Sequence, residues 1–181
     1  MKYSAMRVWL MALTMMDALA FAGCKGQSAR ESVAVVSDSL LRAKGYVVLT
    51  LYKTRTGHIT VTMEVNGKPC VFLVDTGGGA TLIDISKRQS FGLRATTTGD
   101  YAAGIGSVSS LVKTEAHIQI NGHDIKATDI YLMDITYINA QFKKSRARQV
   151  DGVLGTDFLE KHGAVIDYAR RKMYLRVQGS E

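Results

Sequence analysis

Residues 72–83 read Phe-Leu-Val-Asp-Thr-Gly-Gly-Gly-Ala-Thr-Leu-Ile, so an apolar stretch ends in one carboxylate, a threonine and three glycines. A buried strand seldom ends this way unless the backbone there must approach another group closely. Asp75, at the end of the apolar stretch, is partly withdrawn from water. A second carboxylate beside it would make the two share one proton. One could then act as a base toward water while the other donates to a substrate carbonyl. The pattern therefore indicates half of a two-carboxylate active site.

Strand patterns lie on both sides of this segment. Residues 46–52 and 58–65 are rich in β-branched and aromatic side chains or alternate with period two. Asn66-Gly67 and Asn121-Gly122 are typical two-residue hairpin turns, and the second is expected to join 116–120 to 125–133. One short helix is expected at 157–162, ended by Gly163. The chain therefore reads as an all-β domain with one short helix.

Two segments resemble the signatures of clan AA aspartic proteases. Residues 73–77 followed by 80–83 resemble the active-site loop, and the run of glycines is similar to the bacterial, envelope branch of the retropepsin-like proteases. Residues 151–159, Asp-Gly-Val-Leu-Gly-Thr-Asp-Phe-Leu, resemble the second signature, which packs beside that loop before a lone helix. Residues 102–107 are placed like the flap that closes over bound peptide. The resemblance covers residues 46–177 and implies a small closed β-barrel of the acid-protease fold.

The resemblance also implies roles for single residues. Asp75 is the catalytic carboxylate, and no metal or cofactor is needed. The supporting positions are Thr76 and Gly77 in the active-site loop, Gly104, Ile105 and Gly106 in the flap, and Val153, Leu154 and Gly155 as the buttress of the loop. Gly78-Gly79 stands where the family more commonly has alanine after the Asp-Thr-Gly triplet. The leading interpretation is thus an aspartic endopeptidase acting on polypeptides, and the alternative is a non-catalytic peptide-binding lipoprotein with the same fold.

The number of carboxylates predicts an assembly. Asp75-Thr76-Gly77 occurs once, and Asp151-Gly152 lacks the threonine that steadies the family's loop. Asp151 is therefore interpreted mainly as a turn residue, with a role as the second acid as the lesser alternative. A chain with one such aspartate needs a partner, so a homodimer with two copies of Asp75 across a twofold axis is expected.

The first residues resemble a targeting segment. Lys2 and Arg7 precede an apolar stretch, 8–22, that is too short to span a membrane as a helix. Phe21-Ala22-Gly23-Cys24 resembles a bacterial lipobox, whereas Ala20-Phe21-Ala22 also suits ordinary signal peptidase. We expect a signal peptide over 1–23, lipidation of Cys24, a tether over 24–44 and the protease domain over 45–181. This predicts a lipoprotein of the bacterial cell envelope facing the periplasm, with a soluble periplasmic protein as the alternative.

Composition and charge indicate which classes of partner the protein can bind. The 181 residues carry a net charge of +7, with 46% hydrophobic and 22% charged residues, which is typical of one globular domain. Four cations gather at Lys143, Lys144, Arg146 and Arg148 without the interleaved aromatic residues of a nucleic-acid stacking surface. We interpret them as a solvated loop, suited to anionic lipid head groups, and expect no nucleic-acid partner.

Overall fold

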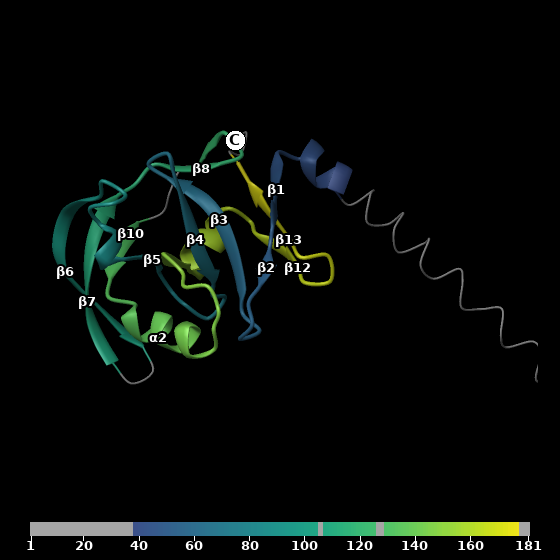
Figure 1. Ribbon diagram of the computed structural model, residues 1–181. Helices are drawn as coiled ribbons and strands as arrows, with labels where there is room; N and C mark the ends of the chain where they lie inside the picture. Colours follow the sequence, from purple (N-terminus) through teal and green to yellow (C-terminus); the bar gives the residue numbers. More distant parts are fainter. Residues whose placement is uncertain (1–37, 105–106, 126–128, 178–181) are drawn as a thin grey trace, which may run out of the picture. The chain divides into compact units, whose positions relative to one another are not determined.

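The computed structural model describes residues 38–104, 107–125 and 129–177 (Figure 1). The chain divides into two compact units, Met1–Leu40 and Leu41–Glu181, and the strands formed by the described residues all lie in the second unit. Residues 38–43 are helical. Among the helices in these ranges, none is long and apolar enough to cross a membrane.

The second unit is built mainly from strands, which form two sheets. The smaller sheet has the order β1-β13-β12, and the larger has the order β6-β7-β10-β5-β11-β4-β3-β8-β9, with β2 paired to β3. The strands are β1 (Tyr46–Thr50), β2 (Tyr52–Lys53), β3 (Ile59–Val65), β4 (Lys68–Val74), β5 (Thr81–Asp84), β6 (Arg94–Gly104), β7 (Ser107–Glu115), β8 (Ile118–Ile120), β9 (His123–Ile125), β10 (Ile130–Met133), β11 (Gly152–Leu154), β12 (Val165–Asp167) and β13 (Lys172–Arg176). The helices are η1 (Ile85–Lys87, 3-10), α2 (Thr136–Lys144) and α3 (Thr156–Lys161). The all-β expectation is confirmed.

Both Asn-Gly turns close hairpins as predicted. Asn66 and Gly67, with φ of 50° and 73°, join β3 to β4, and Asn121 and Gly122, with φ of 50° and 78°, join β8 to β9. Two consecutive positive φ values twist a two-residue turn to match the flanking strands. The arm after the second turn was expected to continue through 125–133. It instead ends at Ile125, and β10 pairs with β5 and β7 elsewhere in the sheet.

The larger sheet differs from the expected closed barrel. Within the described residues, the larger sheet runs from β6 to β9 without these two strands pairing, so it is not closed. β1, β12 and β13 form the separate smaller sheet, in which β13 lies between the other two strands.

The expectation of a single helix is also wrong, because α2 precedes α3. Ile135 and Phe142 are buried with helical spacing, but the buried position between them is a polar residue, Asn139, which hides the apolar period. The side-chain nitrogen Nδ2 of Asn139 donates to the carbonyl oxygen of Val150 at 3.0 Å, and its side-chain oxygen Oδ1 accepts from the backbone amide of Val150 at 2.9 Å. Asp134 accepts from the Thr136 amide at 2.8 Å, and the Thr136 hydroxyl and amide hold the pKa of this carboxyl below its ordinary value. Asp134 thus binds the first amide of α2 from the residue before Ile135, the N-cap position.

β4 lies in the middle of the larger sheet and is buried on both faces. Cys70 and Phe72 pack into one apolar cluster, and Val71 and Leu73 pack into a second cluster that includes Phe142 of α2. A strand covered on both sides reads as a continuous apolar run, which is the pattern seen before Asp75. Burial raises the pKa of the Cys70 thiol far above its ordinary value, so this cysteine is a small buried hydrophobe as predicted. The end of β4 is therefore a rigid platform for the residue that follows it.

Candidate active site

Asp75 follows the last residue of β4 and is fixed by its backbone. Its amide donates to the carbonyl oxygen of Leu154 at 3.0 Å, and its carboxylate oxygen Oδ1 accepts from the Gly77 amide at 3.0 Å. The Asp75 residue is half-buried, whereas Thr76 and Gly77 are exposed. The carboxylate is thus oriented by the chain and open on one side.

The glycines after Thr76 let the chain pass close to this carboxylate. A Cβ on Gly78 would lie 3.1 Å from Oδ2 of Asp75, and one on Gly77 would lie 3.5 Å from Oδ1. A Cβ on Gly79 would meet no atom within 4 Å. Close approach therefore explains Gly78, while Gly79 has room for a side chain.

β11 supports the loop from below. It runs parallel to β4, pairing Val153 with Leu73 and Leu154 with Val74, and its other side pairs with β5. Gly155 follows β11 where no side chain fits, because a Cβ there would lie 2.5 Å from the carbonyl carbon and oxygen of Ala80. Val153, Leu154 and Gly155 therefore lie where the buttress was predicted, directly against the loop that carries Asp75.

The start of α3 holds the far side of the same loop. The Thr81 hydroxyl donates to Asp157 Oδ1 at 2.7 Å and accepts from the Gly155 amide at 3.1 Å, while the Thr81 amide donates to Asp157 Oδ2 at 3.1 Å. The Thr156 amide and hydroxyl both donate to the carbonyl oxygen of Gly78, at 2.7 and 3.0 Å. We call Thr81, Thr156 and Asp157 the α3 clamp.

Sequence reasoning did not give these three residues a role. The available signals were a threonine just before the apolar pair Leu82-Ile83 and an acid in the first turn of a helix, a position that favours negative charge. Neither signal says which segment the side chain binds. Only the pairing of β11 between β4 and β5 brings Asp157 against Thr81.

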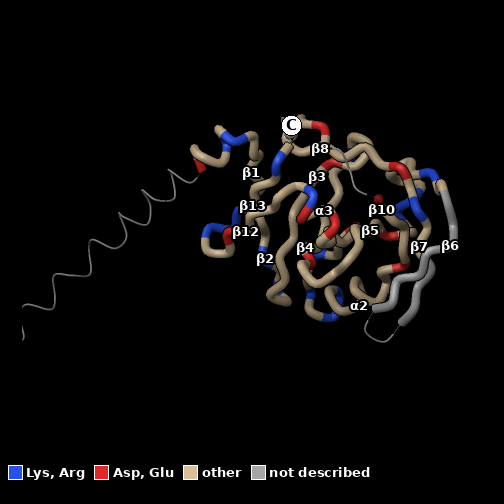
Figure 2. Tube along the Cα trace, turned by 180° about the vertical axis from the view of Figure 1, so that it is seen from behind, with Lys and Arg blue, Asp and Glu red and all other residues tan. Residues whose placement is uncertain are grey.

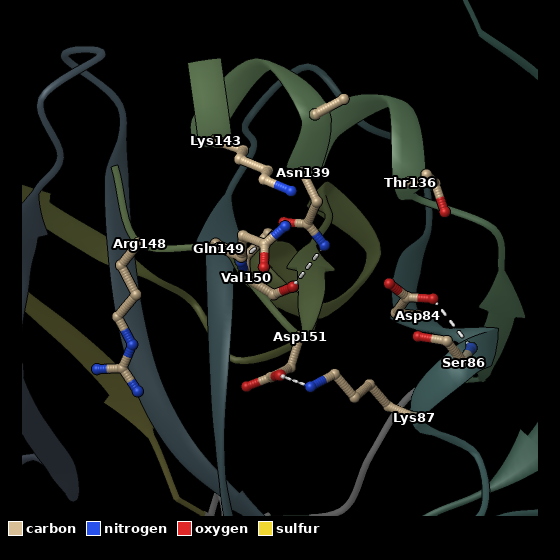
Figure 3. Close-up of a pocket in the computed structure, with 11 residues that line it drawn as sticks. Asp84, Ser86, Lys87, Thr136, Asn139, Lys143, Arg148, Gln149, Val150 and Asp151 are labelled. Carbon is tan, nitrogen blue, oxygen red and sulfur yellow. Dashed lines mark hydrogen bonds and ion pairs between the residues drawn. The ribbon is translucent and has the colours of Figure 1, made fainter. Parts of the chain in front are cut away.

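Asp151 lies at the other end of β11 and has a structural role. Its Oδ1 pairs with Lys87 Nζ at 3.1 Å (Figure 3). Its Oδ2 accepts from the Val71 amide at 3.0 Å, and its own amide donates to the Val71 carbonyl at 2.7 Å. Val71 precedes Asp75 by four residues, which is about 13 Å along a strand. Asp151 of the same chain therefore does not approach Asp75, in agreement with its interpretation as a turn residue.

The predicted flap is a hairpin. β6 and β7 pair antiparallel up to Gly104 opposite Ser107, and they form the long hairpin beside β10 in Figure 1. Ile105 and Gly106, the other two predicted flap residues, lie outside the described residues, as does Cys24. A hollow of about 510 Å³ is lined by Gly79 and Ala80 of the active-site loop and by Leu111 of β7 and Tyr131 of β10. It places space for a ligand next to the loop.

The comparisons with known proteins agree with this site. The model of a family described as "Aspartyl protease" matches residues 61–158, which is more than half of the chain and includes the active-site loop and all but the last residue of the second signature segment. The chain belongs to the aspartyl protease family. Its resemblance to the retropepsin-like proteases is thereby confirmed. A search of curated proteins gives no match.

Several solved structures are similar to this aspartyl protease. EIAV protease complexed with the inhibitor HBY-793 is 23% identical, covering 60% of this chain and 90% of its own, with a TM-score of 0.45. A retropepsin-like aspartic protease from Rickettsia conorii is 19% identical, with coverage of 72% and 90% and a TM-score of 0.48. The retroviral protease-like domain of Ddi1 from Leishmania major is 17% identical, with coverage of 64% and 86% and a TM-score of 0.46.

Proposed function

We propose that this aspartyl protease is an endopeptidase whose active site is a dyad of Asp75 residues from two subunits. The observation that carries the proposal is the setting of Asp75. It follows a strand buried on both faces, its carboxylate is oriented by the Gly77 amide, and its loop is backed by Gly155. A structural carboxylate would need none of this support on an exposed loop. Such preorganisation is what a catalytic carboxylate requires.

The chemistry divides between two carboxyl groups that share one proton. The ionised carboxylate takes a proton from a water as its oxygen attacks the peptide carbonyl carbon, and the protonated partner donates its proton to the carbonyl oxygen. Collapse of the resulting diol breaks the C–N bond as the leaving nitrogen receives a proton from one carboxyl group, and the other carboxylate takes up a proton from a diol hydroxyl, which restores the singly protonated dyad. No metal or cofactor enters this sequence.

A second chain supplies the second carboxyl in this proposal. Thr76 and Gly77 are exposed in the single chain, so their loop is accessible to another copy of itself. Asp151, the nearest alternative in sequence reasoning, is held by Val71 and Lys87 at the other end of β11. With two chains related by a twofold axis, each Thr76 would bond across the axis and hold both loops together. The hairpin of β6 and β7 would cover a polypeptide substrate, with Gly104, Ile105 and Gly106 as the proposed flap residues.

The alternative function is peptide binding without cleavage, in an envelope lipoprotein with the same fold. The observation that favours it is Gly79, because the space around it leaves the loop backbone freer than an alanine would. The fit of Gly78 against the carboxylate favours catalysis instead.

The test is peptide cleavage by the parent and by Asp75→Asn, which keeps the shape of the side chain and removes its charge. We expect the substitution to lower kcat at least a thousandfold, about 4 kcal/mol in activation free energy, with KM little changed. A statine-type inhibitor should bind the parent as a mimic of the tetrahedral intermediate. Retained cleavage by Asp75→Asn would overturn the assignment. Peptide binding without cleavage by the parent would support the alternative.

We also propose that the protein is exported and anchored in the bacterial envelope through a lipid on Cys24, with a soluble periplasmic form as the alternative. The support is the Phe21-Ala22-Gly23-Cys24 segment after the basic and apolar residues of the N-terminus. The parent should partition into the detergent phase of an extraction, and Cys24→Ala should move to the aqueous phase. If both forms partition alike, Cys24 does not carry the anchor.

A further inference from the structure

A second concave site lies away from Asp75 and is strongly basic. It is a groove of about 490 Å³ between the β2–β3 connection, the outer face of β3 and the segment that follows α2. The lining of the groove includes no aspartate or glutamate. It includes four cationic residues, Lys53, Arg55, Arg146 and Arg148. We call these four residues and the hydroxyl-bearing Thr54 and Thr62 the basic groove. Figure 2 shows Lys and Arg segments next to β2 and α2.

The cations of the basic groove are not neutralised by the chain. All four are exposed, and none of the ion pairs between described residues involves them. Asp151, which binds the amide of the groove residue Val71, is already paired with Lys87 at 3.1 Å (Figure 3). Arg148 lies apart from that pair in Figure 3. Four like charges converging on one hollow repel one another, and this repulsion is relieved when an anion enters.

Arg146 occupies a position where the backbone conformation favours glycine. It follows α2 with a φ of +52°, its amide donates to the Lys143 carbonyl at 3.0 Å, and the Ala147 amide donates to the Phe142 carbonyl at 2.8 Å. These two bonds define a helix C-terminal motif whose left-handed residue is most often glycine. A side chain there costs stability, so an arginine that also lines a groove points to a use for its guanidinium.

We infer that the basic groove binds a ligand carrying phosphoryl groups. Guanidinium groups match phosphate oxygens with paired donors, and the exposed Thr62 adds a neutral hydroxyl donor. A single carboxylate carries too little charge to balance four cations, whereas linked phosphoryl groups carry several negative charges within a hollow of this size. The same chemistry is offered by a soluble polyphosphate and by the head group of an anionic lipid. Val71, in the middle of β4, lines the groove, and the lining contains no residue of the active-site loop, so this binding is separate from the proposed catalysis.

The test is a calorimetric titration of the full chain with inorganic tripolyphosphate. We expect saturable binding that weakens as salt is added, and about tenfold weaker binding for Arg146→Gly and for Arg148→Gln. Arg171→Gly is the matched control, because Arg171 also has a positive φ, of 54°, but does not line the groove. Both glycine variants should melt at or above the parental temperature, and only Arg146→Gly should lose binding. Asp75→Asn should bind as the parent does.

Flotation with vesicles then separates the two sources. One set of vesicles contains phosphatidylcholine with phosphatidylglycerol, and the other contains phosphatidylcholine alone. If the first set retains more of the parent protein than the second, and Arg146→Gly loses this difference, the ligand is the lipid head group. Tripolyphosphate binding with equal retention by both vesicles would assign a soluble ligand. The inference is overturned if the parent does not bind tripolyphosphate at millimolar concentration, or if Arg146→Gly binds it as tightly as the parent does. It is also overturned if Arg171→Gly loses as much affinity as Arg146→Gly, or if a tetraglutamate peptide binds the parent more tightly than tripolyphosphate does.

Discussion

Gly155 and Gly79 give a direct comparison of two glycines near one carboxylate. A Cβ on Gly155 would lie 2.5 Å from backbone atoms of Ala80, whereas one on Gly79 would have open space. We expect Gly155→Ala to lower the free energy of unfolding by about 2 kcal/mol or more, because backbone atoms cannot move aside as a side chain can. Gly79→Ala should change it by about 0.5 kcal/mol or less.

Chemical denaturation of both variants, with cleavage measured beside it, checks this expectation. Gly155→Ala should also lose activity, since the displaced atoms belong to the loop that carries Asp75. Equal stability of the two variants would show that Gly155 is not in contact with the loop.

Much at this level could be predicted from the sequence, because short motifs fix both residue type and spacing. Asp75, its glycines and the Val153–Gly155 segment lie together as expected, and Asp151 is a turn residue. The α3 clamp could not be predicted. Hydrogen-bond partners such as Thr81 and Asp157 are 76 residues apart, and no local pattern joins them.

The α3 clamp is the feature of α3 with the clearest consequence for the site. Thr81→Val keeps the shape of the side chain but leaves the Gly155 amide without its acceptor and Asp157 Oδ1 without its donor. We expect this variant to lose about 1–3 kcal/mol of unfolding free energy and to cleave more slowly, because the far side of the loop loses its support. Thr62→Val, at an exposed position of β3, is the control and should stay within about 0.5 kcal/mol of the parent.

Thermal and denaturant unfolding of the two valine variants measures this difference. If Thr81→Val is as stable and as active as the parent, the clamp does not hold the loop.

The elements themselves were only partly predictable. Hairpins with Asn-Gly turns follow from local backbone preferences, and both form. α2 was missed because Asn139 occupies a buried position of its helical face, and its two hydrogen bonds to Val150 exist only in the folded chain. Lys143 and Lys144, expected in a loop, form the last turn of this helix. Sheet closure was also beyond local patterns, since it depends on how β1 and β13 pair across the whole domain.

The molecule as a whole raises the question of the second carboxyl. Asp75 is the proposed catalytic aspartate, and Asp151 is held instead by Val71 and Lys87. If the proposed dyad forms from two chains, activity is linked to association. Specific activity should fall on dilution below the dimer dissociation constant, as mass action favours the monomer.

The most direct measurement is activity in mixtures of parent and Asp75→Asn chains, with sedimentation at the same concentrations. Random pairing of equal amounts places half of the parent chains in heterodimers with one carboxyl, so activity per parent chain should fall to about half, and further with excess variant. The dimer dissociation constant from sedimentation should match the concentration at which specific activity declines. A strictly monomeric protein whose activity per parent chain is unchanged by Asp75→Asn chains would contradict the dyad of two Asp75 residues.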